Sequence, residues 1–155
     1  MSMMSLEQKS FHAAYQKALE SFEANEVPVG AVIIYQGEII AAERNEILTR
    51  KDPSAHAEIL AIRTASRKLN SERLNQCDMY TTLEPCAMCS GAIILSRIRR
   101  VSFIALDEKL PAFRKIVELK NHNWYPHWSH NEMPEYPSSE LLKQFFSKKR
   151  KNSFG

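Results

Sequence analysis

The sequence predicts an α/β fold in which helices pack against a β-sheet. Two observations lead to this class: amphipathic helical segments occur along the chain, and short apolar β-rich runs lie between them. Strands that alternate with helices are typical of sheets covered by helices. The 155 residues are enough to bury a core, and we expect one domain over residues 1–155.

The first third of the chain is expected to form a helix followed by a hairpin. Over residues 5–25 apolar side chains recur at helical spacing, and Ser5 with Gln8 resembles a capping box. Residues 29–35 and 39–43 are β-rich runs. The Gln-Gly-Glu between them predicts that the two strands form a hairpin.

The middle of the chain is expected to alternate helices with strands. Pro53 and Ser54 should open a helix that reaches about residue 68, because proline suits the first helical turn. Pro85 should likewise open a helix that extends to about residue 96. The two strands expected here are residues 78–83 and 101–106, and the loop expected here is residues 45–53.

After residue 107 the pattern becomes less regular. Residues 112–120 are expected to be helical, whereas residues 121–137 are rich in Trp, Tyr, His and Pro and have no clean period. Residues 138–149 should form a last helix. Glu140 lies in its first turn and basic residues lie in its last, as the helix dipole favours.

The composition is that of a globular protein. Apolar residues make up 44% and charged residues 25%, and no run of about eighteen apolar residues suggests a membrane span. The N-terminus lacks the charged-then-apolar pattern of a signal peptide, so we expect a cytoplasmic protein. Three cysteines argue against a disulfide framework and favour metal binding or chemistry. The net charge of +3 does not by itself indicate nucleic-acid binding.

Two motifs predict a metal site. They are His-Ala-Glu at residues 56–58 and Pro-Cys-Ala-Met-Cys at residues 85–89, both near expected helix starts. Cys86 and Cys89 are three residues apart, so both thiols face one side, and the positive ends of the helices favour thiolates. With the imidazole of His56 they make three zinc ligands, which leaves room for a catalytic water.

Glu58 is the expected proton carrier of this site. It follows His56 by two residues, too close for a comfortable fourth ligand but beside the water, whose pKa zinc lowers to about 7. A carboxylate there can move a proton from water to a ring nitrogen and then to the leaving amine. His-x-Glu with Pro-Cys-x-x-Cys is the known signature of zinc-dependent nucleobase deaminases.

A Cys-x-x-Cys pair alone has other interpretations. It also occurs in redox-active sites and in structural zinc sites with four ligands. No second such pair is present in this sequence, and the remaining thiol, Cys77, is isolated. We expect Cys77 to be a small buried apolar side chain.

Four stretches of the chain carry a resemblance to one family. They are Glu-Val-Pro-Val-Gly-Ala-Val at 26–32, Asp-Pro-Ser-Ala-His-Ala-Glu-Ile at 52–59, Leu-Glu-Pro-Cys-Ala-Met-Cys-Ser-Gly-Ala at 83–92, and Ser-Arg-Ile at 96–98 with Val101. The resemblance as a whole covers roughly residues 5–107. Residues 141–150, a Phe-Phe pair followed by basic residues, resemble the same family's last helix. The chain is similar to the cytidine-deaminase superfamily, and within it to the bacterial tRNA-specific adenosine deaminases.

The resemblance implies a three-layer α/β/α fold with a five-stranded mixed sheet flanked by helices, one zinc ion per chain, and a homodimer. It implies deamination of the wobble adenosine in a tRNA anticodon loop to inosine. It also implies that Asn45 contacts the flipped nucleoside, that Pro28 and Val29 line its pocket, and that the Ala57 amide lies near the base. An asparagine in a turn is often a local cap instead, and that alternative stays open for Asn45.

The C-terminal third departs from the family pattern. Residues 110–114 are Leu-Pro-Ala-Phe-Arg where the tRNA enzymes usually have a Gly-Ala-rich turn ending in Ser. The fifth strand is not evident, since a proline makes residues 131–134 a poor strand. In the superfamily this region helps form the substrate pocket, so a deaminase of a free base or nucleoside, such as guanine or cytosine, remains an alternative. A non-catalytic zinc-stabilised RNA-binding subunit is a third, which the intact Glu58 disfavours.

Two further clusters have two interpretations each. The aromatic segment can be a stacking platform or lid for a base, or a loop packed onto the sheet; its members are Trp124, Tyr125, Trp128 and Tyr136, with His122, His127 and His130 among them. A second metal site from these histidines is disfavoured, because Glu132 and Glu135 are the sole nearby carboxylates.

The basic tail can bind RNA phosphates or can be a solvated helix end. It consists of Lys143, Lys148, Lys149, Arg150 and Lys151. No acidic residue occurs from position 141 onward. Because the resemblance is to enzymes that act on tRNA, we favour RNA contact through Lys148, Lys149 and Arg150.

Overall fold

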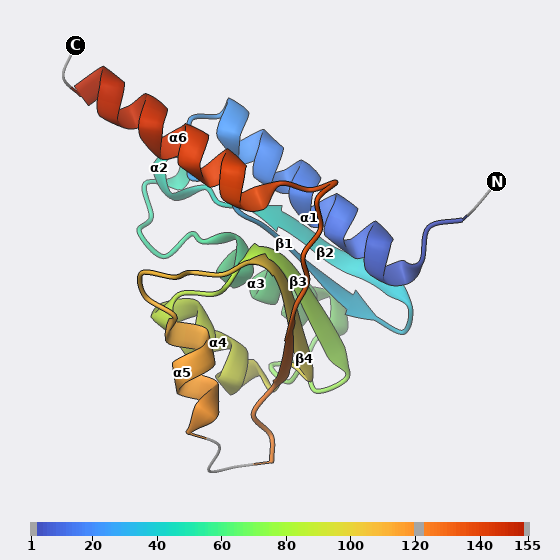
Figure 1. Ribbon diagram of the computed structural model, residues 1–155. Helices are drawn as coiled ribbons and strands as arrows, with labels where there is room; N and C mark the ends of the chain where they lie inside the picture. Colours follow the sequence, from blue (N-terminus) through green and yellow to red (C-terminus); the bar gives the residue numbers. More distant parts are fainter. Residues whose placement is uncertain (1–2, 120–122, 154–155) are drawn as a thin grey trace.

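A five-stranded sheet lies between two layers of helices (Figure 1). The computed structural model describes residues 3–119 and 123–153. The helices and strands in chain order are α1 (Leu6–Glu23), β1 (Gly30–Tyr35), β2 (Glu38–Arg44), α2 (Ile47–Arg50), α3 (Ala57–Leu69), β3 (Cys77–Leu83), α4 (Ala87–Ser96), β4 (Arg100–Ala105), α5 (Ala112–Glu118), β5 (His127–His130) and α6 (Ser138–Ser153).

The sheet is mixed, and its strand order is β2-β1-β3-β4-β5. β1 runs antiparallel to both β2 and β3, whereas β3, β4 and β5 are parallel to one another. Figure 1 shows α1 and α6 together on one face, and α3, α4 and α5 on the other. The α/β class and the five-stranded mixed sheet flanked by helices are therefore confirmed.

The first helix fits tightly against the sheet. Ser5 and Gln8 form the expected reciprocal capping box, which fixes the start of α1. Its buried face includes Phe11, Ala14 and Ala18. A side chain at Gly30 would lie 1.9 Å from the carbonyl oxygen of Ala14, so only glycine lets β1 approach the helix this closely.

The predicted hairpin is present, and its turn explains the sequence between its strands. Tyr35 pairs with Glu38, so the turn has two central residues, Gln36 and Gly37. Both have positive φ, at 49° and 80°, as a type I′ turn requires. This turn matches the twist of the flanking strands and sets the register of the pair.

The two helices of the metal motifs begin later than expected. α3 begins at Ala57 with His56 as its N-cap, so the prediction that Pro53 and Ser54 open this helix was wrong. The reason is local: the Asp52 carboxylate accepts hydrogen bonds from the Ser54 N–H and hydroxyl, and so forms a turn instead. α4 likewise begins at Ala87, after Pro85, with Cys86 as N-cap. The expected loop over residues 45–53 contains the short helix α2.

The fifth strand, which was not evident in the sequence, is β5. Its sequence His-Trp-Ser-His has no apolar alternation, and its pairing with β4 specifies it instead. The hydroxyls of Ser102 and Ser129 are 2.9 Å apart across that pair, and Trp128 stacks on Phe103 at 5.7 Å between ring centroids. As expected, the proline-containing residues 131–134 are not part of the sheet.

The remaining C-terminal elements follow the sequence prediction closely. α5 matches the helix expected over 112–120 except at its end, where Lys120 lies outside the described residues. α6 is longer than expected and reaches residue 153. Among the described residues, no helix has the length and apolar character needed to cross a membrane.

Candidate metal centre and active site

The sheet topology brings the expected site residues to one edge of the sheet, the edge formed by the end of β3, the start of β1 and the end of β2. Cys86 follows the end of β3, and β1 runs antiparallel to β3 with Ala31 opposite Thr81. Residues just before β1 therefore lie at the same edge as residues just after β3. Asn45 follows the end of β2, which pairs antiparallel with β1, so it also belongs to this edge.

His56, Cys86 and Cys89 form a compact group of ligand atoms. Nδ1 of His56 is 3.5 Å from Sγ of Cys86 and 3.5 Å from Sγ of Cys89, and all three atoms lie within 4.8 Å of one another. Tetrahedral zinc, with Zn–N about 2.0 Å and Zn–S about 2.3 Å, holds a nitrogen and a sulfur ligand about 3.5 Å apart. The donor set and its spacing therefore fit a zinc ion.

The electrostatics of this group suit a cation. The pKa of the Cys86 thiol falls to about 4, because the Cys89 thiol and the His56 imidazole hydrogen-bond to the thiolate. The Cys86 thiolate in turn raises the pKa of His56. The pKa of Cys89 is raised by the adjacent Cys86 and by burial. The group therefore favours the thiolate form of Cys86, which is the form of cysteine that binds a metal ion.

Glu58 lies in the first turn of α3 and is buried, with 4% of its surface exposed. Burial raises the pKa of its carboxyl to about 7, although the nearby His56 and Cys89 act in the opposite direction. A carboxyl group with a pKa near neutrality can both accept and donate a proton at physiological pH. The site thus pairs three atoms that could ligate a metal ion with a buried carboxyl group.

Glu84 lies between the end of β3 and the Pro85-Cys86 motif, and its role could not be predicted from the sequence. Its side chain is fully buried, and it accepts hydrogen bonds from the backbone N–H groups of Asp107 and Arg114. Nε of Arg114 donates to both carboxylate oxygens, at 3.0 and 3.1 Å. The divergent segment around residues 110–114 is therefore tied directly to the strand end that leads to Cys86. A glutamate just before a Pro-Cys motif was the available signal, but its partner is distant in sequence.

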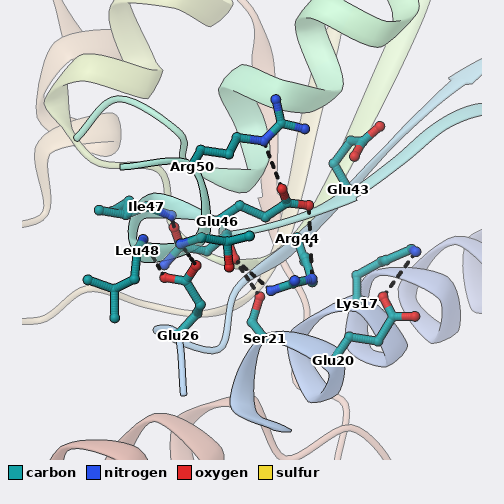
Figure 2. A network of polar contacts seen from close by, with 12 residues as sticks. Lys17, Glu20, Ser21, Glu26, Glu43, Arg44, Glu46, Ile47, Leu48 and Arg50 are labelled. Atoms are coloured by element: carbon teal, nitrogen blue, oxygen red, sulfur yellow. Dashed lines mark hydrogen bonds and ion pairs between the residues drawn. The ribbon is translucent and has the colours of Figure 1, made fainter. Parts of the chain in front are cut away.

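The loop around Asn45 is held by a dense set of hydrogen bonds (Figure 2). Nδ2 of Asn45 donates to the Val27 carbonyl at 3.1 Å, and Oδ1 accepts from the Ile47 N–H at 3.4 Å. The Ser21 hydroxyl donates to the Asn45 carbonyl at 2.9 Å. These contacts give the buried Asn45 the local role that was left open, and its contact with a substrate stays a prediction.

Glu26 anchors the same loop from below the short helix. Its carboxylate accepts hydrogen bonds of 2.8 Å from the N–H groups of Leu48 and Thr49, in the first turn of α2 (Figure 2). Burial raises the pKa of Glu26, but the hydrogen bonds from Thr49 and Leu48 outweigh it and lower the pKa overall. No local sequence pattern identifies the role of Glu26, since its hydrogen-bond partners follow it by 22 and 23 positions.

The other predicted pocket residues lie at the same edge of the sheet. Pro28 and Val29 immediately precede β1 and are buried. Ala57 is the first residue of α3 and is fully buried. The Glu46 N–H donates to the Ala55 carbonyl at 3.0 Å, which joins the Asn45 loop to the segment that carries His56.

The aromatic segment divides among three places. Trp128 stacks on Phe103, and Tyr136 contacts His12 and Tyr15 on α1, both as expected for aromatics packed onto the fold. Trp124 lies at the other edge of the sheet, beneath Arg97. His122 lies outside the described residues. Within residues 3–119 and 123–153, no second group of three metal-ligating side chains occurs.

The basic tail lies on α6. Lys148, Lys149, Arg150 and Lys151 are exposed, and Lys143, Lys148 and Lys151 line one hollow of the helix surface. The ammonium of Lys148 is 5.9 Å from the ring of Phe22, and that of Lys149 is 5.4 Å from the ring of Phe145. The helix packs on α1 through residues such as Phe145, so its cations are displayed on a fixed surface.

Sequence comparison identifies the family of the chain. The family model described as MafB19-like deaminase matches residues 5–150. The chain belongs to this deaminase family. The tRNA-specific adenosine deaminase of Aquifex aeolicus (strain VF5) is 45% identical over 142 residues, which cover 90% of this chain and 93% of that protein. The tRNA-specific adenosine deaminase of Bacillus subtilis (strain 168) is 37% identical over 140 residues, 89% of this chain and 87% of that protein.

Solved structures support the deaminase fold. A structure from a study of A-to-I editing by tRNA:A34 deaminases at the wobble position of transfer RNA superposes with a TM-score of 0.78 at 37% identity, covering 86% of this chain and 99% of the other. The guanine deaminase of Bacillus subtilis superposes with a TM-score of 0.63 at 31% identity, covering 91% of this chain and 94% of the other. The relationship to the family thus extends over the divergent C-terminal third.

Proposed function

We propose that this deaminase-family chain is a zinc-dependent enzyme that converts the wobble adenosine of tRNA to inosine by hydrolytic deamination. The observation that carries the proposal is the three-ligand group of His56, Cys86 and Cys89 beside the buried Glu58. Similarity to tRNA-specific adenosine deaminases over about nine tenths of the chain supports the substrate. The same similarity supports a single deaminase domain over residues 1–155.

His56, Cys86 and Cys89 would hold one zinc ion per chain. When bound, zinc would supply a Lewis acid that activates a water molecule for attack on the base. Glu58 would take a proton at its carboxylate oxygen and deliver it to the ring nitrogen, then carry a second proton to the leaving amine. Its burial beside the three ligand residues supports this role.

The pocket residues would orient the flipped base. Pro28 and Val29 would form an apolar wall, and the N–H of Ala57 would face the base at the start of α3. The side-chain amide of Asn45 already bonds to Val27 and Ile47, so it would contact the nucleoside through the second N–H of its Nδ2 or the second lone pair of its Oδ1. The hydrogen bonds that fix this loop would hold the pocket in one geometry and reduce the cost of ordering it upon binding.

The cations of α6 would bind the anticodon arm. Lys148, Lys149 and Arg150 are exposed on one rigid helix, and contacts with phosphates do not depend on sequence. A homodimer is proposed as well: Met88 and Leu95 are seven residues apart on α4, so they share a helix face, and both are exposed. A bacterial tRNA-modifying enzyme of this kind would work in the cytoplasm.

A free-base deaminase is the second candidate. The match to a guanine deaminase at 31% identity and the unusual segment over 110–114 favour it. The two candidates are separated by incubating the zinc-loaded protein with an anticodon stem-loop bearing adenosine at the wobble position, and with guanine, cytosine, adenine and their nucleosides. The proposal predicts inosine in the stem-loop and no ammonia from the small molecules. Ammonia release from guanine with an unmodified stem-loop would contradict it.

A further inference from the structure

A second recess lies at the other edge of the sheet, where β3, β4 and β5 begin, far from the candidate metal site. It has a volume of about 370 Å³ and is formed by the loops that enter β3, β4 and β5. These three strands are parallel, so their first residues share an edge. The described residues that line it are Arg73, Asn75, Arg97, Arg99, Asn123, Trp124, Tyr125 and His127.

This recess is separate from the metal centre. Cys86 follows the last residue of β3, whereas Arg73 and Asn75 precede its first. Seven residues at about 3.3 Å each place the two edges about 20 Å apart. A small molecule bound in the recess would not touch the metal ligands.

Arg97 is pre-organised to face a ligand. It occupies the C-cap of α4 in the left-handed region, with φ of 66°. Its guanidinium carbon lies 3.5 Å from the centroid of Trp124, and its Nη1 donates to the Ile94 carbonyl at 3.3 Å. A guanidinium has five N–H donors, so stacking and this one bond fix its plane while donors remain for an anion.

The lining is basic, aromatic and free of carboxylates among the described residues. Arg99 forms a bidentate pair with Asp78, with both bonds at 3.0 Å, so its charge is offset and its side chain is rigid. Nε of Arg73 is 3.8 Å from a carboxylate oxygen of Glu72, and both side chains are exposed. Arg73 and Arg97 therefore supply the net positive charge of the recess.

The neighbouring aromatics add a second kind of recognition. Trp124 and Tyr125 lie edge to face with ring centroids 4.9 Å apart, and Asn75 and Asn123 place amide groups on the same lining. Arginine beside aromatic side chains is the combination that binds phosphate and stacks with bases. An inorganic anion would use the arginines alone, whereas a nucleotide would use both features.

We propose that this recess is a binding site for a nucleotide phosphate, distinct from the deamination site. Arg97 and Arg73 bind the phosphate, and Trp124 with Tyr125 contacts the base or ribose. Two sources share this chemistry: a free mononucleotide, or a nucleotide unit of an RNA whose other part lies elsewhere on the protein.

The test uses tryptophan fluorescence of the full-length, zinc-loaded protein. Trp124 and Trp128 are the two tryptophans of the chain, so the Trp128→Phe variant leaves Trp124 as the reporter inside the recess. In this background the probes are uridine 5′-monophosphate, inorganic phosphate and an anticodon stem-loop. We compare Arg97→Gln, Arg97→Lys and Arg73→Gln with a matched charge change at the exposed Lys9 on α1, Lys9→Gln. Thermal unfolding of each variant establishes that it folds.

The proposal predicts a saturable fluorescence change that Arg97→Gln weakens by about tenfold to a hundredfold, the effect of losing a charge-assisted hydrogen bond. Arg97→Lys should bind with intermediate affinity, and Lys9→Gln should bind normally. Saturation by the mononucleotide assigns a free nucleotide, and saturation by the stem-loop alone assigns RNA. No saturable change with any probe, or equal affinities in Arg97→Gln and Lys9→Gln, would overturn the proposal. Deamination, measured separately, does not enter this result.

Discussion

Removing the Arg114 side chain should destabilise the region next to the metal motif. Glu84 is fully buried, and Arg114 Nε donates to both of its oxygens. The Arg114→Met substitution keeps the volume of the side chain but leaves a buried carboxylate with two backbone donors, the N–H groups of Asp107 and Arg114 itself. The Glu84–Arg114 pair joins the end of β3 to α5, so its loss should destabilise both elements.

The magnitude follows from the burial of the two partners. Breaking a buried ion pair by removing one partner costs about 3–5 kcal/mol. Two considerations reduce this value: the Arg114 side chain is 27% exposed, and the two backbone hydrogen bonds to Glu84 remain. We therefore expect a loss of about 2–3 kcal/mol in the free energy of unfolding. In a chain of this size that corresponds to a fall in Tm of about 4–12 °C.

The assay is urea and thermal unfolding of the zinc-loaded protein. Lys115→Met is the matched control, since Lys115 is the next residue of α5 and is exposed. It should change the free energy of unfolding by less than about 0.5 kcal/mol. The double variant Glu84→Gln with Arg114→Met should recover part of the loss, because it leaves no buried charge unpaired. Equal stability of Arg114→Met and Lys115→Met would show that the Glu84–Arg114 pair does not stabilise the protein.

Three further predictions concern the metal, the Asn45 loop and the basic helix. His56→Ala and Cys86→Ala should each lose zinc, as measured by elemental analysis of the purified protein, and full retention in both would contradict the ligand assignment. The hydrogen bonds from Thr49 and Leu48 hold the pKa of the Glu26 carboxyl below its ordinary value of 4.5. The ionised Glu26 therefore stabilises the fold fully above pH 4.5, and this stabilisation disappears as the pH falls through the lower pKa of the folded state. Glu26→Gln should therefore lower stability at pH 7 and reduce the loss of stability on acidification below pH 4.5, which unfolding curves at pH 7 and pH 3 would measure. Joint replacement of Lys148, Lys149 and Arg150 by alanine should weaken binding of an anticodon stem-loop and flatten its salt dependence by somewhat less than about one log unit per phosphate contact; an unchanged slope would exclude α6 from the RNA interface.

The candidate metal-ligand cluster could be predicted because each of its two motifs is short and lies at a helix start. His56 and Cys86 are thirty positions apart, and the fold brings their ligand atoms and that of Cys89 within 4.8 Å of one another. The capping box and the two-residue hairpin turn are local in the same sense. In the capping box and the hairpin turn a few neighbouring residues specify the geometry.

The features that escaped prediction depend on contacts between distant residues. β5 has no strand pattern of its own and is defined by pairing with β4. The start of α3 was misplaced because the Asp52 side chain competes for the Ser54 N–H and forms a turn where proline suggested a helix. Glu84 and Arg114 are thirty positions apart, so only the tertiary structure shows that the unusual residues 110–114 brace the metal motif.

The most direct test of the proposed mechanism is the Glu58→Gln variant assayed on an anticodon stem-loop, together with its zinc content. The substitution keeps the size of the buried side chain but removes its capacity to carry protons. We expect one zinc ion per chain, as in the unmodified protein, and a rate of inosine formation reduced by about a hundredfold to ten-thousandfold or more. A zinc-loaded Glu58→Gln protein that forms inosine at a near-normal rate would contradict the assignment of Glu58 as the proton carrier.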